Sequence, residues 1–211
     1  MIVVDVFIIV LLFLLFAFSH TWLASLKIKK NFAERMGAKI AFYRLFYNLS
    51  SLLLFAFFYF VSPKPDIIVY DLHYPFDIIT FALQFLSFIG LMWAVKGTDL
   101  KEFIGYAQVQ RYFNGDYNIG DLDEKQIFRK EGAFKLVRHP IYLFSILFLG
   151  LRPTMDLFYL VMFICITIYF YVGSIYEEKK LIEIFGDEYK KYQQSVPRLV
   201  PFVRFNKGLY P

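Results

Sequence analysis

Two short segments of the chain combine charged side chains with a change of backbone structure. The first is Arg138-His139-Pro140, which stands directly before an apolar run. Proline is well tolerated in the first turn of a helix, and it keeps the residue before it in extended backbone. The unbonded N–H groups of such a helix, together with the Arg138 charge, suit an anion such as a carboxylate. The alternative is a positively charged flank of a membrane-spanning helix.

The second segment is Glu177-Glu178, at the end of another apolar run. On a helix that turns about 100° per residue, Glu178 falls on an apolar stripe and Glu177 lies at its flank. The other members of this stripe are Leu181, Ile182, Phe185, Tyr189 and Tyr192. We therefore expect Glu178 to be the more buried of the two. A buried carboxylate needs a partner, which is either a cationic side chain in a structural salt bridge or the ammonium group of a ligand.

Together the two segments complement a zwitterionic amino-acid head. One offers a cation and free N–H groups for a carboxylate, and the other offers a carboxylate for an ammonium group. Tyrosines near both segments, such as Tyr142 and Tyr189, have faces that can hold an adenine or a sulfonium by stacking and cation–π contact. The alternative for these tyrosines is an aromatic belt at a membrane interface.

The composition indicates the setting for these groups. Hydrophobic residues make up 58% of the 211 residues and aromatic residues 21%, which is too apolar for a soluble domain of this size. We predict an all-α polytopic membrane protein with five transmembrane helices, the fourth short, and a cytosolic amphipathic C-terminal helix. The first apolar run lacks the basic start and small-residue cleavage site of a signal peptide, so we expect a retained span. The expected spans are Ile2–Leu23, Ile40–Val61, Phe76–Val95, Ile141–Leu151 and Leu157–Tyr176.

The distribution of basic residues predicts the orientation of these spans. Five Lys and Arg residues lie between Lys27 and Lys39, eight between Lys96 and Arg138, and seven from Lys179 to Lys207. The two other connections carry one each, Lys64 and Arg152. The positive-inside rule then places the N-terminus outside and the C-terminus in the cytosol, in the inner membrane if the cell is bacterial.

The same counts and the cysteine content exclude several classes of protein. The basic residues follow the ends of apolar runs and form no single patch, so we expect membrane lipids and no nucleic acid as partners. The one cysteine, Cys165, excludes an internal disulfide and a cysteine-only metal site, and no metal centre is predicted. The eleven glycines contain no G-x-G pair, so the nucleotide-binding loop of a Rossmann domain is absent.

The spacing of the two segments carries a resemblance. The pattern R-H-P-x-Y, then E-E about 35 residues later, then L-x-x-x-F-G-x-x-Y-x-x-Y-x-x-x-V-P, resembles the integral membrane methyltransferases. These include the isoprenylcysteine carboxyl methyltransferases and the phospholipid methyltransferases. Short upstream matches, at Ser19-His20-Thr21, Asp99 to Phe103 and Pro153-Thr154-Met155, are similar to the methanethiol S-methyltransferase branch. The pattern is matched by Arg138, His139, Pro140, Tyr142, Glu177, Glu178, Leu181, Phe185, Gly186, Tyr189, Tyr192, Val196 and Pro197.

The resemblance implies an enzyme that transfers a methyl group from S-adenosyl-L-methionine to a small thiol or a lipophilic acceptor. The implied catalytic residues are His139 and Arg138, with His139 as the candidate if a base is needed. The implied cofactor-binding residues are Arg138, His139, Pro140, Tyr142, Glu177, Glu178, Leu181 and Tyr189. We predict one domain over residues 1–211, with an N-terminal three-helix part (1–95) and a cofactor-binding part (96–211).

Three polar residues in the predicted first and second spans are candidates for a substrate cavity: His20, Arg44 and Asn48. A hydrogen bond between helices is an equally good interpretation of His20. Three alternative functions stay open at this point. They are an isoprenylcysteine carboxyl or phospholipid methyltransferase, a haem-dependent membrane isomerase, and a non-enzymatic transporter-like protein.

Overall fold

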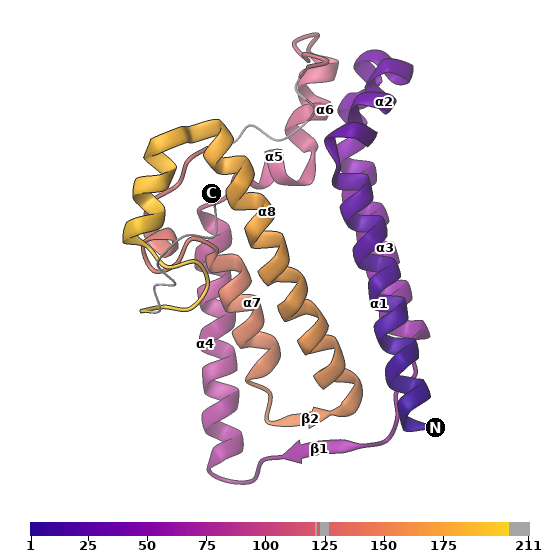
Figure 1. The fold of residues 1–211 in the computed structure, drawn as a ribbon, viewed down its shortest axis with the longest axis vertical. Coiled ribbons are helices and arrows are strands. Elements are labelled where there is room, and N and C mark those ends of the chain that lie inside the picture. The colour runs from indigo at the N-terminus through magenta and orange to yellow at the C-terminus, as the bar shows by residue number, and fades with distance from the viewer. Residues whose placement is uncertain (121, 123–126, 203–211) are drawn as a thin grey trace. The chain divides into compact units, whose positions relative to one another are not determined.

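The computed structural model describes residues 1–120, 122 and 127–202, and the chain divides into two compact units (Figure 1). Unit 1 consists of Met1–Pro65 and Thr98–Ile127, and unit 2 consists of Asp66–Gly97 and Phe128–Pro211. Each unit is therefore made from two separate stretches of the chain.

Unit 1 is built on a helical hairpin. Its elements are α1 (Ile2–Ala24), α2 (Leu26–Met36), the 3-10 helix η1 (Gly37–Phe42), α3 (Tyr43–Val61), α5 (Leu100–Ile104) and α6 (Tyr106–Phe113). The hairpin core contains Phe13 of α1 and Phe58 of α3, which are buried with their ring centroids 5.5 Å apart in an edge-to-face contact. Burial of two aromatic rings is a large apolar contribution to packing.

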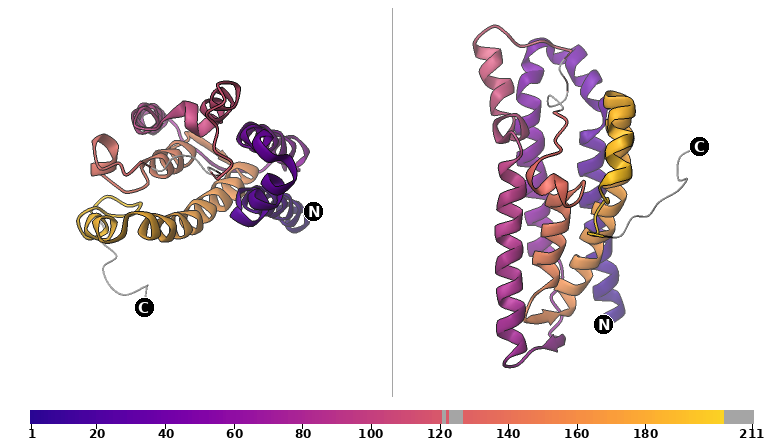
Figure 2. Two further views of the ribbon diagram at one scale, coloured as in Figure 1. Left: turned by 90° about the horizontal axis from the view of Figure 1, so that it is seen from above. Right: turned by 90° about the vertical axis from the view of Figure 1, so that its left-hand side faces the viewer.

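Unit 2 carries three long or apolar helices and a short two-stranded ribbon. Its elements are β1 (Ile68–Asp71), α4 (Phe76–Lys96), the 3-10 helix η2 (Gly132–Lys135), α7 (Pro140–Gly150), β2 (Thr154–Asp156) and α8 (Leu157–Ser195). Helix α7 lies alongside both α4 and α8 (Figures 1 and 2). A Cβ atom at Gly90 would lie 2.3 Å from the Phe144 ring, so this close approach of α4 to α7 requires glycine. The antiparallel strands β1 and β2 were not predicted from the sequence.

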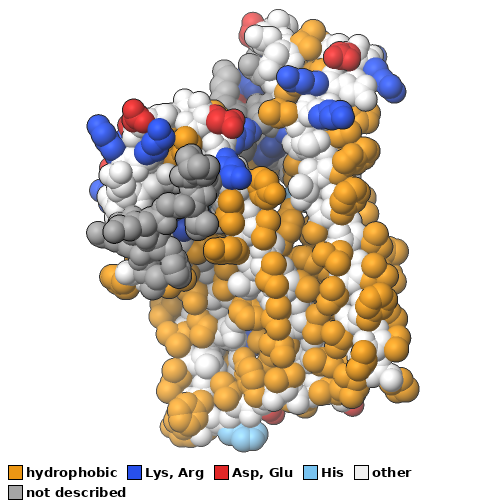
Figure 3. Space-filling view, viewed as in Figure 1, with side chains coloured by type: hydrophobic (Ala, Val, Ile, Leu, Met, Phe, Trp, Pro, Cys, Tyr) orange, Lys and Arg blue, Asp and Glu red, His pale blue; other side chains and the backbone are white. Residues whose placement is uncertain are grey.

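The prediction of an all-α polytopic membrane protein is confirmed. Among the described residues, four helical segments are long and apolar enough to span a bilayer: Ile2–Ala24, Leu26–Val61, Phe76–Lys96 and Leu157–Ser195. The predicted fourth span corresponds to α7, a shorter apolar helix. Hydrophobic side chains cover the sides of the helices in each unit, while Lys and Arg side chains gather near one end of each unit (Figure 3).

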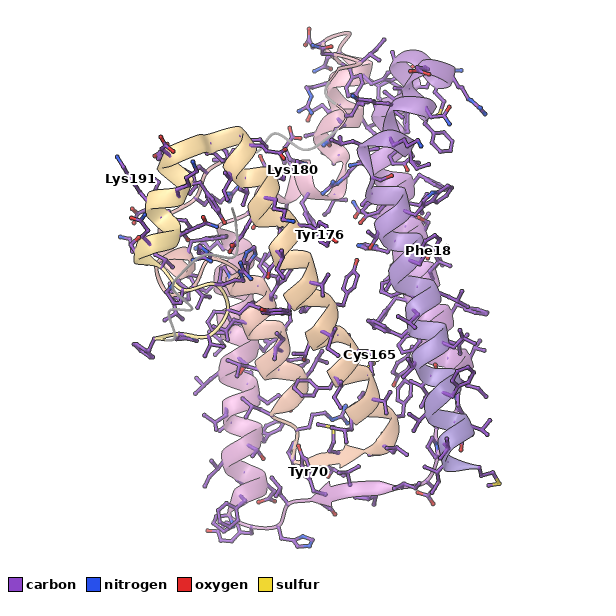
Figure 4. All side chains as sticks on the ribbon, in the orientation of Figure 1. Phe18, Tyr70, Cys165, Tyr176, Lys180 and Lys191 are labelled. Atoms are coloured by element: carbon purple, nitrogen blue, oxygen red, sulfur yellow. The ribbon has the colours of Figure 1, made fainter. Side chains whose placement is uncertain are left out.

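One predicted feature of the C-terminal helix is wrong. The apolar stripe beginning at Glu178 was expected to continue on one helix as far as Tyr192. Instead Gly186 leaves the helical region of backbone space, with φ 56° and ψ −132°, and α8 bends there. Figure 4 labels Lys180 before this bend and Lys191 after it, and shows the second part of α8 folding back. The helical wheel therefore applies only up to Phe185.

Candidate active site

Glu178 is the centre of a buried polar cluster in unit 2. Its side chain is 0% exposed, although it carries a carboxylate. Arg138 donates to both carboxylate oxygens, with Nε 2.7 Å from Oε1 and Nη2 3.1 Å from Oε2. Gln193 Nε2 and Arg198 Nη2 also donate to Oε2, at 2.9 and 3.1 Å. A two-point contact between a guanidinium and a carboxylate is among the strongest polar contacts in proteins.

The segment that follows α8 fixes the backbone on which Arg138 stands. The N–H of Arg138 donates to the carbonyl of Pro197 (2.8 Å), and the N–H of His139 donates to the carbonyl of Arg198 (3.1 Å). The Nη1 group of Arg138 donates to the carbonyls of Gln193 (3.0 Å) and Val196 (2.5 Å). The Arg138 guanidinium is thus bound by protein groups, and its side chain is only 9% exposed.

His139 joins the two neighbouring glutamates. Its Nε2 lies 3.2 Å from Glu178 Oε1, and its Nδ1 lies 3.3 Å from Glu177 Oε2. Burial alone would lower the pKa of His139, but its hydrogen bonds to Glu177 and Glu178 and the charges of both carboxylates outweigh burial and raise the pKa above 6.5. An imidazolium uses both ring N–H groups as donors, which matches two carboxylate partners. In that state His139 has no lone pair with which to accept a proton.

Glu177 is the accessible member of the pair. Its side chain is 50% exposed, and its Oε2 accepts a hydrogen bond from the Tyr142 hydroxyl (3.0 Å). The Tyr142 ring stacks between two others, 5.3 Å from His139 and 4.5 Å from Phe170 between centroids. Tyr142 thereby ties the first turn of α7 to the exposed carboxylate on α8.

The start of α7 provides donors beside that carboxylate. Pro140 occupies the first helical position and is buried, and Leu143 makes the first backbone bond of the helix, to the carbonyl of His139. The N–H groups of Ile141 and Tyr142 precede that bond and have no acceptor within the helix. An exposed carboxylate and the positive end of a helix therefore lie side by side, as the two ends of a zwitterionic amino-acid head require.

The aromatic residues of the C-terminal part are packed inside unit 2. Tyr189 and Tyr192 are both buried, and their ring centroids lie 5.5 and 5.4 Å from that of Phe128. The Tyr192 hydroxyl donates to the carbonyl of Phe134 (2.5 Å). Leu181 is half-buried on α8. The structure thus places Tyr189 in a packed aromatic cluster, where its ring faces contact protein.

The three predicted cavity residues belong to unit 1. His20 Nδ1 lies 2.8 Å from the Ser51 hydroxyl, and His20 Nε2 lies 2.7 Å from the Tyr47 hydroxyl. These contacts join α1 to α3, so His20 makes the hydrogen bond between helices that the sequence left open.

Arg44 and Asn48 both reach the end of α5. Arg44 Nε donates to the carbonyl of Phe103 (3.0 Å), and Asn48 Nδ2 donates to the carbonyls of Phe103 and Ile104 (2.9 Å each). Carbonyls at the end of a helix lack partners within the helix, so these contacts are structural. Arg44 also borders a cavity of about 10 Å³, which is no larger than one water molecule.

Two residues of the cluster were missed from the sequence, Gln193 and Arg198. They lie 15 and 20 positions after Glu178, beyond a bend that the helical wheel did not include. The only local signal is that Arg198 directly follows the Val196-Pro197 end of the matched pattern. A pattern match by itself does not identify the residue that a neighbouring side chain contacts.

Comparison with known proteins gives matches of one kind. The chain is 33% identical over 199 residues to Methanethiol S-methyltransferase 1 of Bradyrhizobium diazoefficiens, covering 92% of this chain and 66% of that protein. It is 31% identical over 195 residues to Methanethiol S-methyltransferase 2 of the same organism, covering 90% and 71%. A match to Methanethiol S-methyltransferase of Pseudomonas deceptionensis is 41% identical over 81 residues.

The coverage of these relatives differs from one to the next. The chain spans just under two thirds of the first Bradyrhizobium protein and 31% of the Pseudomonas protein. No model of a known protein family and no solved structure matches the chain.

Proposed function

The chain belongs to the methanethiol S-methyltransferase family, and from this premise we propose that it transfers a methyl group from S-adenosyl-L-methionine to a small thiol at the membrane. The observation that carries the proposal is the pairing of the exposed Glu177 carboxylate with the N-terminal end of α7. Both groups lie in unit 2, on residues of the pattern that resembles the membrane methyltransferases.

The residues present fit the amino-acid head of this cofactor. Glu177 can accept hydrogen bonds from its ammonium group, and the N–H groups of Ile141 and Tyr142 can donate to its carboxylate. The faces of the Tyr142 ring are covered by His139 and Phe170, so Tyr142 acts through its hydroxyl, which donates to Glu177 Oε2, and through its backbone N–H. When bound, the cofactor supplies an electrophilic methyl group on its sulfonium.

Arg138, His139 and Glu178 have a different role in this proposal. They bind one another and the chain after α8, so they fix the start of α7 against α8. His139 as an imidazolium also orients Glu177 through Nδ1. These three are positioning residues, while Glu177 and Tyr142 face the ligand. Catalysis by alignment suits methyl transfer, since holding the reacting atoms about 3–3.5 Å apart can contribute roughly 7–11 kcal/mol.

The acceptor proposed is a small thiol such as methanethiol. A thiol has a pKa of about 8.5, so a fraction is already ionised at neutral pH and needs no protein base. Displacement by the thiolate sulfur would give a methyl thioether and S-adenosylhomocysteine. The absence of a required base is consistent with a site in which His139 holds its proton between two carboxylates.

The proposal extends to the placement of the chain in the membrane. We infer that the connections rich in Lys and Arg face the cytosol, with the N-terminus outside, because basic residues favour that side. The Arg138–Glu178 cluster then lies at the cytosolic end of unit 2, where a water-soluble cofactor is available.

One experiment tests the function directly. The purified full chain is titrated with S-adenosylhomocysteine by calorimetry and assayed with S-adenosyl-L-methionine and methanethiol, with dimethyl sulfide measured by gas chromatography. We expect saturable binding and methanethiol turnover above that of a prenylated cysteine or a phospholipid. Faster turnover of either lipophilic acceptor would favour the isoprenylcysteine carboxyl or phospholipid methyltransferase alternative. Failure to bind S-adenosylhomocysteine would overturn the proposal and favour a transporter-like protein.

The haem-dependent alternative has its own measurement. Both ring nitrogens of His20 and of His139 already contact protein side chains, so haem ligation would have to break these contacts. The purified protein should show no Soret absorption band, and added haem should keep the spectrum of free haem. A stoichiometric Soret band would support the isomerase.

A further inference from the structure

Helix α2 of unit 1 begins directly where the first membrane-spanning segment ends. Helix α1 ends at Ala24, Ser25 is extended (φ −66°, ψ 139°), and α2 starts at Leu26. Helix α2 and η1 then lead into α3, whose chain returns along α1. Within the segment Leu26–Val61, α3 alone has 19 residues, close to the length that a bilayer requires, so we expect α2 to lie outside the hydrocarbon core, at the level of the lipid headgroups.

The buried side of α2 is narrow. Lys29 and Ala33, four positions apart, are its buried residues, and Ala33 packs in a cluster with Ile40 and Tyr43. Three large apolar side chains on the flanks of this buried ridge are exposed: Leu26, Phe32 and Met36. An amphipathic helix of a soluble protein would normally bury such residues.

Exposed cations border these apolar flanks. Around a helix with 3.6 residues per turn, Arg35 lies about 60° from Phe32, and Lys30 lies about 40° from Leu26. Lys27 is exposed between the two cations, and Glu34 is the one acidic residue of α2. From the protein outward, each side of α2 therefore runs from buried ridge to exposed apolar side chain to basic group.

We propose that α2 binds anionic phospholipids, with Leu26, Phe32 and Met36 among the upper acyl chains and Lys27, Lys30 and Arg35 at the phosphates. An apolar flank with basic residues at its edge is the composition of helices that lie in a membrane interface. Trp22, exposed in the last turn of α1, adds an interfacial anchor next to this helix. A free phosphate would use the cations alone and leave the apolar flanks in water.

The test uses tryptophan fluorescence of the full chain in lipid vesicles. Trp93→Phe leaves Trp22 as the single tryptophan, one helical turn before α2. The variant is reconstituted in two kinds of phosphatidylcholine vesicle. One contains brominated phosphatidylglycerol and the other contains brominated phosphatidylcholine, with the bromine atoms near the headgroup end of the acyl chains in both. At low salt, we expect the quenching of Trp22 to correspond to a phosphatidylglycerol concentration beside α2 about fivefold or more above that of the bulk bilayer. The enrichment should shrink as sodium chloride is raised, because salt screens the headgroup charges.

The charge variant and its control decide the assignment. Lys27→Gln, Lys30→Gln and Arg35→Gln together should bring the two quenching curves into agreement. The same change at three exposed lysines of unit 2, Lys135, Lys190 and Lys191, should leave the enrichment intact. Equal quenching by the two lipids in the Trp93→Phe protein, or enrichment that survives the α2 triple change, would overturn the proposal. If inorganic phosphate abolished the enrichment and also bound the detergent-solubilised protein equally well without vesicles, the three cations would form a site for a soluble anion, and the proposal would be overturned.

Discussion

Two adjacent carboxylates, Glu177 and Glu178, have opposite surroundings. Glu178 is enclosed by Arg138, His139, Gln193 and Arg198, whereas Glu177 is half exposed. The helical phase predicted which of the two would be buried. It left open whether a protein cation or a ligand ammonium would meet Glu178, and the structure provides two protein guanidiniums. We therefore assign ligand contact to Glu177 and a positioning role to Glu178.

This assignment predicts different losses in the two glutamine variants. Glu177→Gln should weaken S-adenosylhomocysteine binding about tenfold to a hundredfold, since a charge-assisted hydrogen bond contributes ~1.5–3 kcal/mol. Its melting temperature should fall less than that of Glu178→Gln, because Glu177 is half exposed and a glutamine oxygen can still accept hydrogen bonds from His139 and Tyr142. Glu178→Gln should lower the melting temperature strongly, since breaking a buried ion pair costs ~3–5 kcal/mol. Calorimetry and thermal melting in detergent give both quantities. If Glu178→Gln kept the wild-type melting temperature but lost S-adenosylhomocysteine binding, Glu178 and not Glu177 would be the residue that contacts the ammonium group of the ligand.

His139 predicts a dependence of stability on pH. Its folded-state pKa lies above the unfolded value of 6.5, so its contribution is complete below that pH and is lost as pH rises through the folded-state pKa. The wild type should exceed His139→Gln in melting temperature most at about pH 6, and the difference should shrink towards about pH 9. A difference that stays constant over this range would show that the ring is bound as neutral imidazole.

At the scale of elements, apolar runs predicted the long helices, but neither α2 nor the bend in α8. The expected spans and the observed α1, α3 and α4 agree closely in position, because a bilayer demands about 20 apolar residues and internal backbone hydrogen bonds. Helix α8 begins at the expected Leu157 but continues beyond the expected Tyr176 to Ser195. Gly186 gave no such signal, since glycine also occurs within helices, as Gly173 does in the same α8. The ribbon β1–β2 has four and three residues, too few for a periodic pattern.

The bend has a measurable energetic signature. At φ 56° and ψ −132°, Gly186 adopts a backbone conformation that side chains strongly disfavour, so Gly186→Ala should destabilise the protein by about 1–3 kcal/mol. It should also weaken S-adenosylhomocysteine binding, because the bend returns Gln193 and Arg198 to Glu178. Gly173→Ala is the matched control. A Cβ there meets nothing within 4 Å, so the change should be neutral or add up to ~1 kcal/mol of stability. Equal melting temperatures for Gly186→Ala and Gly173→Ala would contradict the bend at Gly186.

At the scale of the whole molecule, the ribbon constrains the path through the membrane. Asp71 of β1 pairs with Thr154 of β2, and the Tyr70 hydroxyl donates to the carbonyl of Arg152 (3.1 Å). We therefore expect the connection before α4 and the connection after α7 to lie on the same side of the bilayer. These are also the two connections with one basic residue each, Lys64 and Arg152. The pairing of β1 with β2 and the low number of basic residues are two independent observations, and both place these two connections together.

Cysteine accessibility tests this topology, and the single native cysteine makes the experiment simple. In a Cys165→Ser background, cysteines replacing Lys64 or Arg152 should react with an impermeant maleimide in intact cells. Cysteines replacing Lys30 or Lys191 should react only after the cells are opened, because they lie in the basic segments. Helix α7 must then cross to the outer side with eleven residues, a rise of only ~17 Å, so it needs a thinned bilayer or shielding by α4 and α8. If the cysteine at position 64 reacted from outside and the cysteine at position 152 reacted only from inside, the pairing of β1 with β2 would be contradicted and α7 would be re-entrant. If both cysteines reacted only from inside, the pairing of β1 with β2 would stand but the orientation of the protein in the membrane would be the reverse.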